Sequence, residues 1–329
     1  MRKRTLPNSG LAVSRLGLGT STWGLPGTDD DAAAQLRLFA DAGGTLIETA
    51  NVYGDGGSED VIGRQLSTVF RRADFVIATK AGLVPGKPPL RTDASCSAML
   101  SELESSLRRL RTDYVDLWQV HAWDWRMPVE ETLSAFDKAV SAGKARAVGC
   151  CNYCGWQTAK AATIQQTRGR TPLATVEVEY SLLQRGIERE VGPASAEFGL
   201  GILPWAPLGR GVLTGKYRYG IPAARRDSAF FRWYVEKYAT DERRALIVDE
   251  VLRCAGELGV TPAVVALCWV RDRPGVIAPL VGARTVDQLA GSLPAELFEL
   301  PEEIRARLDA VSATPITYPE HRLDQRSTG

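Results

Sequence analysis

Histidine and methionine are scarce in this chain of 329 residues, which has two histidines, His121 and His321, and three methionines. Cys151 and Cys154 match the C-x-x-C pattern of a redox pair or of half a zinc site, but no second pair of ligands lies near them. A structural zinc site needs about four ligands. We therefore expect no metal, and the six cysteines are better interpreted as buried free thiols.

An excess of charge and long apolar runs are also missing. Forty Lys and Arg residues oppose 39 Asp and Glu residues, a net charge of +1 that predicts neither a nucleic-acid nor an anionic-membrane partner. No apolar run approaches the roughly 20 residues that span a bilayer, and no apolar stretch of a signal peptide follows the basic start. We expect a cytoplasmic protein with a single domain over residues 1–329 and a core at about 12–312. A homo-oligomer is left open.

Two patterns of dinucleotide enzymes are absent. The stretch GLGTST at residues 17–22 lacks the third glycine of the phosphate-binding loop that opens a doubly wound sheet. The chain also has no Tyr-x-x-x-Lys, the pattern of the short-chain reductases. An open sheet built for a dinucleotide is therefore disfavoured.

Short apolar runs alternate with helix-patterned stretches, which is typical of βα units around a parallel sheet. The candidate strands are eight in number, at residues 15–19, 46–49, 75–79, 114–120, 145–150, 175–179, 201–205 and 276–279. Helices are expected at 93–110, 128–142 and 261–271, the first with an acidic cap candidate, Asp93, and the last opening on Thr261-Pro262. Together with the missing phosphate loop, eight strands favour an α/β fold, the (β/α)8 TIM barrel.

One stretch interrupts the alternation. Residues 208–239, after the seventh strand, are too many for an ordinary connection and are rich in Gly, Arg and aromatic residues. In a barrel such a loop lies at the C-terminal face, so we expect it to contact ligand rather than to be a plain surface insertion. A C-terminal loop follows the last helix-patterned stretch.

Proton-handling side chains stand at the predicted C-terminal ends of successive strands, where barrel enzymes place their chemistry. Glu48 ends the second strand and leads to Tyr53, Lys80 ends the third, and His121 ends the fourth. In carbonyl reduction a hydride reaches the carbon and a proton must reach the developing alkoxide. A lysine about 4 Å from a phenol favours the phenolate by up to roughly 4 kcal/mol, which predicts a phenol pKa lowered by up to about 3.

In this hypothesis Glu48 holds Lys80 by ion pairing, Tyr53 donates the proton, and His121 donates a hydrogen bond to the substrate oxygen. Each residue also has a structural explanation, namely a plain ion pair, a loop aromatic and a satisfied polar residue. The joint spacing and order favour the catalytic interpretation.

The chain resembles the aldo-keto reductases over nearly its whole length. The resemblance is carried by VSRLGLGT at 13–20, ETANVYGDGGSE at 48–59, ATK at 78–80, LRRLRTDYVDLWQVH at 107–121, GCCNY at 149–153, WAPLGRG at 205–211 and GARTVDQ at 282–288. The region around Trp205 and the following GKYRYGIP at 215–222 is most similar to the branch that contains bacterial reductases and potassium-channel β subunits.

The resemblance implies an NADP(H)-dependent enzyme with a small-molecule carbonyl substrate. It makes Tyr53 the proton donor, Lys80 its activator and His121 the residue that orients the carbonyl. Asn152 matches the residue that binds the nicotinamide carboxamide, and Trp205 matches the aromatic that stacks on the nicotinamide ring. The other expected cofactor positions are Gly19, Thr20, Cys151, Glu177, Ala206, Pro207, Leu208, Gly209, Gly211, Lys216, Arg226, Gly282, Arg284, Gln288 and Ser292.

Basic residues among these positions decide the expected form of the cofactor. Lys216, Arg226 and Arg284 match positions near the adenosine phosphate, although each can also be a solvated surface charge. A guanidinium suits a phosphate through paired hydrogen bonds, which favours NADPH over NADH.

The chain departs from the family pattern at several positions. Glu48 replaces the usual Asp, Cys151 replaces a Ser, and Glu177 replaces a Gln. Gly291-Ser292 replaces a common Glu-Asn pair, so an adenine contact is expected to be missing. A reductase with an adapted pocket is the favoured interpretation, and an NADPH-binding sensor or partner subunit with slow turnover is the alternative.

The substrate is left open by the sequence. Trp23, Trp123 and Trp125 stand beside the predicted strand ends, where they would line a roomy pocket for an aryl group or a keto-sugar. They would otherwise be core residues under the loops.

Overall fold

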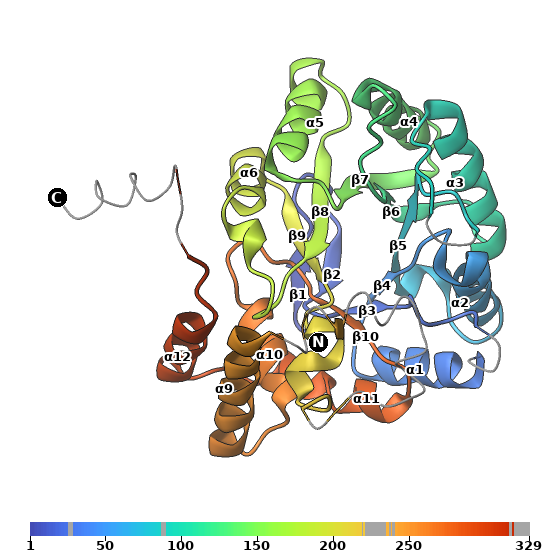
Figure 1. Ribbon diagram of the computed structural model, residues 1–329. Coiled ribbons are helices and arrows are strands. Elements are labelled where there is room, and N and C mark those ends of the chain that lie inside the picture. Colours follow the sequence, from blue (N-terminus) through green and yellow to red (C-terminus); the bar gives the residue numbers. More distant parts are fainter. Residues whose placement is uncertain are drawn as a thin grey trace.

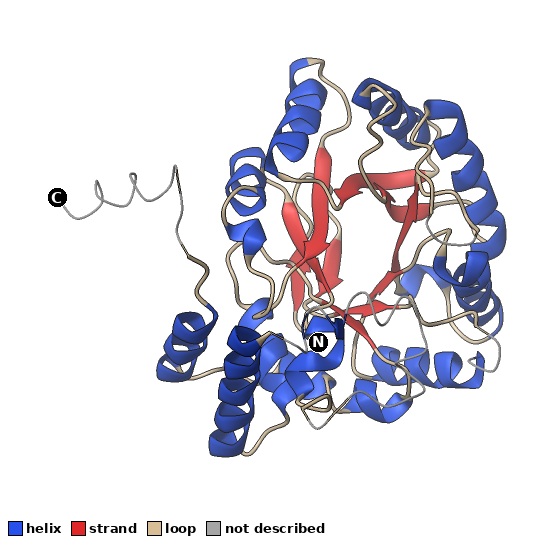
Figure 2. Cartoon of the chain, viewed as in Figure 1, coloured by secondary structure: helices blue, strands red, loops and turns tan. Residues whose placement is uncertain are grey.

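The computed structural model describes residues 1–25, 29–86, 90–218, 220, 235–236, 238, 241–315 and 318. Eight parallel strands form an inner ring with helices outside it, which Figures 1 and 2 show nearly along the axis of the ring. The strands are β3 (Gly17–Gly19), β4 (Leu46–Glu48), β5 (Val76–Ala81), β6 (Val115–Val120), β7 (Ala145–Cys151), β8 (Leu173–Glu179), β9 (Gly201–Trp205) and β10 (Leu280–Gly282). The predicted TIM barrel is confirmed.

The eighth strand lies later in the chain than predicted. Residues 276–279 were expected to form it, but β10 is Leu280–Gly282, and Val276 makes only an isolated bridge to Ile202. Ile277 donates its N–H to Ile202 on one side, whereas the carbonyl of Pro279 accepts from Gly17 on the other. Because proline has no N–H, the ladder cannot run straight through Pro279. The segment therefore closes the ring by pairing first with β9 and then with β3.

Helices cover the outside of the barrel. They are α1 (Asp29–Asp41), α2 (Gly57–Thr68), α3 (Cys96–Leu110), α4 (Val129–Ser141), α5 (Gly155–Thr167), α6 (Val191–Phe198), α9 (Glu242–Leu258), α10 (Pro262–Arg271), α11 (Val286–Ala290) and α12 (Glu302–Ser312). Thr261 caps α10 as predicted, because its hydroxyl accepts from the Val264 N–H. The cap of α3 was predicted wrongly: it is Ser95, and Asp93 instead accepts from the Ser95 hydroxyl.

An antiparallel hairpin that the sequence analysis did not predict precedes the barrel, with strands β1 (Lys3–Thr5) and β2 (Ala12–Ser14). Its residues Leu6 and Val13 are fully buried against a cluster inside the ring, to which most strands contribute a small or aliphatic side chain such as Ala78, Leu117 and Ala147. A larger core cluster fills the space between strands and helices. The ring is therefore packed and closed at the hairpin end.

Short 3₁₀ helices occur in the connections, at η1 (Tyr53–Gly56), η2 (Arg72–Asp74), η3 (Gly186–Glu188), η4 (Gly209–Thr214) and η5 (Leu293–Glu296). The long segment predicted at 208–239 begins with η4, and most of its remainder lies outside the described residues, as does the end of the C-terminal loop. Within the described residues no helix alone is long and apolar enough to cross a membrane; α9 and α10, bent by 104°, pass that test only as a pair.

Candidate active site

The four residues predicted to handle protons meet at the end of the barrel formed by the C-terminal ends of the strands. The Lys80 ammonium is fully buried and forms an ion pair with Glu48, and its Nζ lies 3.2 Å from the Tyr53 phenol oxygen. The phenol donates to a Glu48 oxygen at 3.0 Å. The rings of Tyr53 and His121 meet edge to face, 6.0 Å between centroids. The structure therefore brings together the whole predicted set.

Parallel strand register explains this meeting. Glu48 is the last residue of β4, Lys80 lies near the end of β5, and His121 directly follows β6. Adjacent parallel strands end at the same edge of the sheet, so these side chains converge although 73 positions separate the first from the last. Gly19 pairs with Glu48 across β3 and β4, and a Cβ on Gly19 would lie 3.2 Å from the Glu48 carboxylate. Glycine therefore leaves room for the longer acid.

Glu177 contacts Lys80, which the sequence did not predict. One of its oxygens lies 3.1 Å from Lys80 Nζ, and the other accepts from Gln119 Nε2 at 2.7 Å. Both oxygens are thus engaged within the barrel, whereas Glu177 was expected to face the nicotinamide. Gln119 was missed, although it stands two residues before His121 and pairs in register with Lys80. The period of two along a strand was the signal that could have found it.

The pKa of Tyr53 is shifted in the direction opposite to the one expected. Burial and the carboxylate of Glu48 raise the pKa of the phenol well above 10, and Lys80 lowers it by less. The expected lowering took account of the ammonium but not of desolvation or of the second charge. The phenol therefore keeps its proton at neutral pH.

Charge on the neighbouring groups follows from the same balance. Burial disfavours the Lys80 ammonium, but Glu177 and Glu48 outweigh it and hold the pKa of Lys80 well above its usual value. Burial and then Lys80 hold the pKa of His121 well below 6.5. His121 is therefore neutral at physiological pH, and its buried Nδ1 has no hydrogen-bond partner among the residues that the structure describes. A neutral imidazole keeps one N–H, which can donate to a carbonyl oxygen.

The residues expected around the nicotinamide form a hydrogen-bonded group. Trp205 Nε1 donates to Asn152 Oδ1 at 3.0 Å, and Asn152 Nδ2 donates to the His121 carbonyl and to Cys151 Sγ, each at 3.1 Å. Asn152 has φ 58°, a conformation that non-glycine residues rarely adopt and that often marks a functional site. The Arg210 guanidinium lies over the Trp205 ring at 5.1 Å.

The loop expected to lie over the pyrophosphate has the backbone for close approach. It runs through Ala206, Pro207 and Leu208 into η4, where Gly209 and Gly211 have φ 54° and 89°. A Cβ on Gly211 would lie 2.5 Å from Lys216 Nζ, so the lysine head lies directly against this loop. Both glycines are buried, and a Cβ on Gly209 would lie 2.6 Å from Leu183, so glycine allows the loop this tight, left-handed path. Across the ring, the Thr20 hydroxyl donates to the Glu48 carbonyl at 2.8 Å and is fully buried.

Residues expected at the adenosine end have different surroundings. Gly282 ends β10, and Arg284 is exposed in the connection to α11, where its backbone N–H donates to Gln288 Oε1 at 3.0 Å. Ser292 is buried, and its hydroxyl donates to the Gln288 carbonyl at 2.9 Å, so its role in cofactor binding stays a prediction. Arg226 lies outside the described residues.

Four aromatic rings gather beside His121. Trp123 contacts Trp125, Tyr153 and Trp156 at centroid distances of 6.1, 5.1 and 5.2 Å. Trp125 is 76% exposed and Trp156 50% exposed, so the aromatic cluster (these four residues) presents ring surface to solvent. The expectation for Trp23 is wrong, because its ring is 1% exposed in the core and its Nε1 donates to Gln35 at 3.4 Å.

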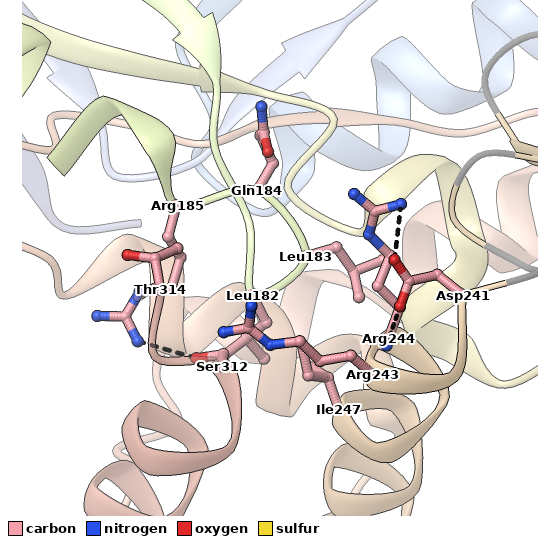
Figure 3. A pocket seen from close by; sticks show the side chains of 10 residues that line it. All are labelled: Leu182, Leu183, Gln184, Arg185, Asp241, Arg243, Arg244, Ile247, Ser312 and Thr314. Carbon is pink, nitrogen blue, oxygen red and sulfur yellow. Dashed lines mark hydrogen bonds and ion pairs between the residues drawn. The ribbon is translucent and has the colours of Figure 1, made fainter. Parts of the chain in front are cut away.

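The cavity in Figure 3 is separate from these residues. It has a volume of about 150 Å³ and lies between the turn after β8, the start of α9 and the end of α12. Its arginines already have partners: Arg185 donates to Ser312 and Arg244 pairs with Asp241. None of the four proton-handling residues lines it. We therefore place the site at the mouth of the barrel.

The arrangement defines a class of protein: a (β/α)8 barrel with a Tyr–Lys–His–carboxylate group at its C-terminal face. The family model described as "Aldo/keto reductase family" matches residues 15–313. The chain is 34% identical to the uncharacterized oxidoreductase YrpG of Bacillus subtilis (94% of this chain, 95% of that protein). It is also 34% identical to a probable voltage-gated potassium channel subunit beta of Oryza sativa subsp. japonica (90% and 91%).

A glycerol dehydrogenase from Gluconobacter oxydans has a similar structure, with a TM-score of 0.80 and 29% identity over 96% of this chain and 98% of that one. The chain therefore belongs to the aldo/keto reductase family, as the resemblance predicted. It is an oxidoreductase, and its family implies a nicotinamide cofactor and a small-molecule carbonyl substrate.

Proposed function

We propose that this protein uses NADPH to reduce an aldehyde or ketone to the alcohol, with Tyr53 as the proton donor. The observation that carries the proposal is the 3.2 Å distance between Lys80 Nζ and the Tyr53 phenol oxygen, inside a buried group that includes Glu48. When bound, the cofactor supplies a hydride. The residues of the chain must then orient the carbonyl and deliver a proton to its oxygen.

Each residue has a defined part in that delivery. Tyr53 passes its proton to the oxygen as negative charge develops there. The Lys80 ammonium stabilises the phenolate that remains, and Glu48 keeps the ammonium in place through their ion pair. His121, being neutral, donates a hydrogen bond that orients the substrate oxygen.

The cofactor residues are assigned from the fit of the site. Asn152 holds its amide beside the His121 carbonyl, and the Arg210 guanidinium from the glycine-containing loop lies over the Trp205 ring at 5.1 Å. We assign Asn152 to the carboxamide and Trp205 to the nicotinamide ring. Lys216 and the exposed Arg284 would meet phosphates, and a guanidinium next to the ribose favours NADPH.

The substrate is assigned to the aromatic cluster. Trp123 follows His121 by two residues, and the exposed rings of Trp125 and Trp156 extend the surface outward. Aromatic faces pack against aryl groups and sugar rings. Aryl aldehydes and keto-sugars are therefore the first substrates to try.

Single-turnover oxidation of bound NADPH by 4-nitrobenzaldehyde tests the proposal. We expect the absorbance of the reduced nicotinamide to decay in the wild type and to persist in Tyr53→Phe, which keeps the ring but lacks the proton. Equal decay in both proteins would remove Tyr53 from the mechanism. Decay in neither would favour the second candidate.

That second candidate is an NADPH-binding sensor or partner subunit with slow turnover. One observation favours it: a carboxylate oxygen of Glu177 lies 3.1 Å from Nζ of Lys80 and pairs with the lysine that must assist Tyr53. One of the relatives is also named as a channel subunit rather than as an enzyme. In that case tight NADPH binding would be seen without carbonyl-dependent oxidation.

A further inference from the structure

Lys80 has more acceptors around it than it has hydrogens. An ammonium carries three N–H donors. Its Nζ lies within reach of one carboxylate oxygen of Glu48, the Thr49 carbonyl at 3.2 Å, the Tyr53 phenol at 3.2 Å and Glu177 at 3.1 Å. At any moment one of these acceptors therefore receives no hydrogen bond from Lys80.

Charge decides which acceptor is left out. Hydrogen bonds to ionised carboxylates are roughly twice as strong as those to neutral oxygens. Lys80 therefore donates preferentially to Glu48 and to an ionised Glu177. The Tyr53 phenol is neutral and already donates its own hydrogen to Glu48 at 3.0 Å. Ionised Glu177 thus accepts the Lys80 N–H that the Tyr53 phenolate would need after Tyr53 has given up its proton.

We propose that Glu177 is a positioning residue of the proton donor: ionised, it holds a Lys80 N–H away from Tyr53, and as a carboxylic acid it releases that N–H to the phenol. The inference rests on the proposed function, because it concerns the acid that protonates the carbonyl. The proton that Glu177 gains or loses is exchanged with solvent and is not the one transferred to substrate.

The surroundings of Glu177 accommodate both protonation states. In the structure Gln119 donates to Glu177 at 2.7 Å and accepts from the Thr175 hydroxyl at 2.9 Å, which suits an ionised carboxylate. A half-turn of the Gln119 amide would present its oxygen to a carboxylic acid proton and its N–H to Thr175. The hydroxyl accepts as readily as it donates, so no buried group would lose its partner.

The charged neighbours make a neutral Glu177 accessible. The titratable groups that face it come from β4, β5, β7 and the loop after β4, and they are Glu48, Lys80, Cys151 and Tyr53. Burial raises the pKa of Glu177, Lys80 lowers it and Glu48 raises it, with a result of about 7. Burial and Glu177 also raise the pKa of Cys151, so its thiol stays protonated over the same range. Two acids beside a single ammonium leave a net negative charge that one proton neutralises.

The test compares pH profiles of single-turnover NADPH oxidation by 4-nitrobenzaldehyde in the wild type and in Glu177→Gln. We expect the wild-type rate to fall about tenfold to a plateau as pH rises through about 7, the equivalent of one hydrogen bond to a charged group. Glu177→Gln should stay at the fast level, because a glutamine offers Lys80 an uncharged oxygen. Glu59→Gln is the matched control: Glu59 is equally buried but pairs with Arg109, so this variant should keep the wild-type profile.

Three results would overturn the role of Glu177: a wild-type rate without an inflection near neutral pH, the same inflection in Glu177→Gln, or a folded Glu177→Gln that is inactive at every pH.

If that variant does not fold, Gln119→Met serves instead. It removes the N–H that stabilises the ionised acid, so the inflection should move to higher pH, and an unmoved inflection would contradict the proposal. If wild-type turnover depends on Tyr53 but is unaffected by residue 177, only the proposal for Glu177 is wrong. Absent turnover in the wild type defeats the proposed function as well.

Discussion

Replacing Lys80 by methionine removes the buried ammonium while keeping most of the side-chain volume. The Nζ lies 3.2 Å from the Tyr53 oxygen, and at an effective dielectric near 20 a full phenolate at that distance gains about 5 kcal/mol from the lysine. If half of that charge has developed in the transition state, about 2.5 kcal/mol is lost, or roughly 70-fold in rate. Loss of the contact that positions Glu48 adds to this, so we expect turnover to fall by at least about 100-fold.

The assay is single-turnover NADPH oxidation, with folding and NADPH affinity measured on the same preparation. The extra measurements are needed because breaking a buried ion pair destabilises a protein by about 3–5 kcal/mol. Lys144→Met is the matched control, since Lys144 pairs with Glu104 at the surface, where the side chains are 38% and 44% exposed. It should react at the wild-type rate. A folded, NADPH-binding Lys80→Met within about tenfold of the wild type would refute the role of the lysine.

Three further outcomes are expected. Glu48→Asp should keep measurable activity because it restores the usual residue of the family; complete loss of turnover in steady-state assays would show that the site is built around the longer acid. Arg284→Ala should weaken NADPH binding more than NADH binding in fluorescence titrations, and equal weakening would mean that Arg284 does not touch the 2′-phosphate. The raised pKa of Glu177, about 7 against 4.5, means that its contribution to stability is full below about pH 4.5 and is lost as pH rises through about 7. Denaturant unfolding should therefore show Glu177→Gln gaining stability relative to the wild type over this range, by up to about 3 kcal/mol, and parallel stability curves would contradict the shift.

Much of the site could be predicted because it depends on short-range patterns. Apolar runs bounded by helix-patterned stretches located the strands, and the residue types that end three of them, with the tyrosine that follows the first, suggested proton transfer. Parallel strands bring their C-terminal ends together whatever their separation in sequence. Knowledge of where each strand ends was therefore enough to predict that Glu48, Lys80 and His121 meet.

Contacts that depend on how the ring closes were not predicted. Residues 276–282 pair with two different neighbours because they close the ring, and only the assembled barrel shows that the change of partner falls near Pro279. Trp23 and Trp123 both stand beside strand ends, yet one ring is in the core and the other joins an exposed cluster. A side chain's position in sequence does not say which neighbouring element covers it.

The sequence by itself determined the barrel, the order of its strands and the residue types that stand at their ends, because periodicity and residue type are local properties. Only the tertiary structure decided that Glu177 contacts Lys80 and that the pKa of Tyr53 is raised rather than lowered. Both depend on burial and on charges that neighbouring strands bring within a few ångströms. Coulomb energies change steeply over such distances, and spacing along the chain does not record them.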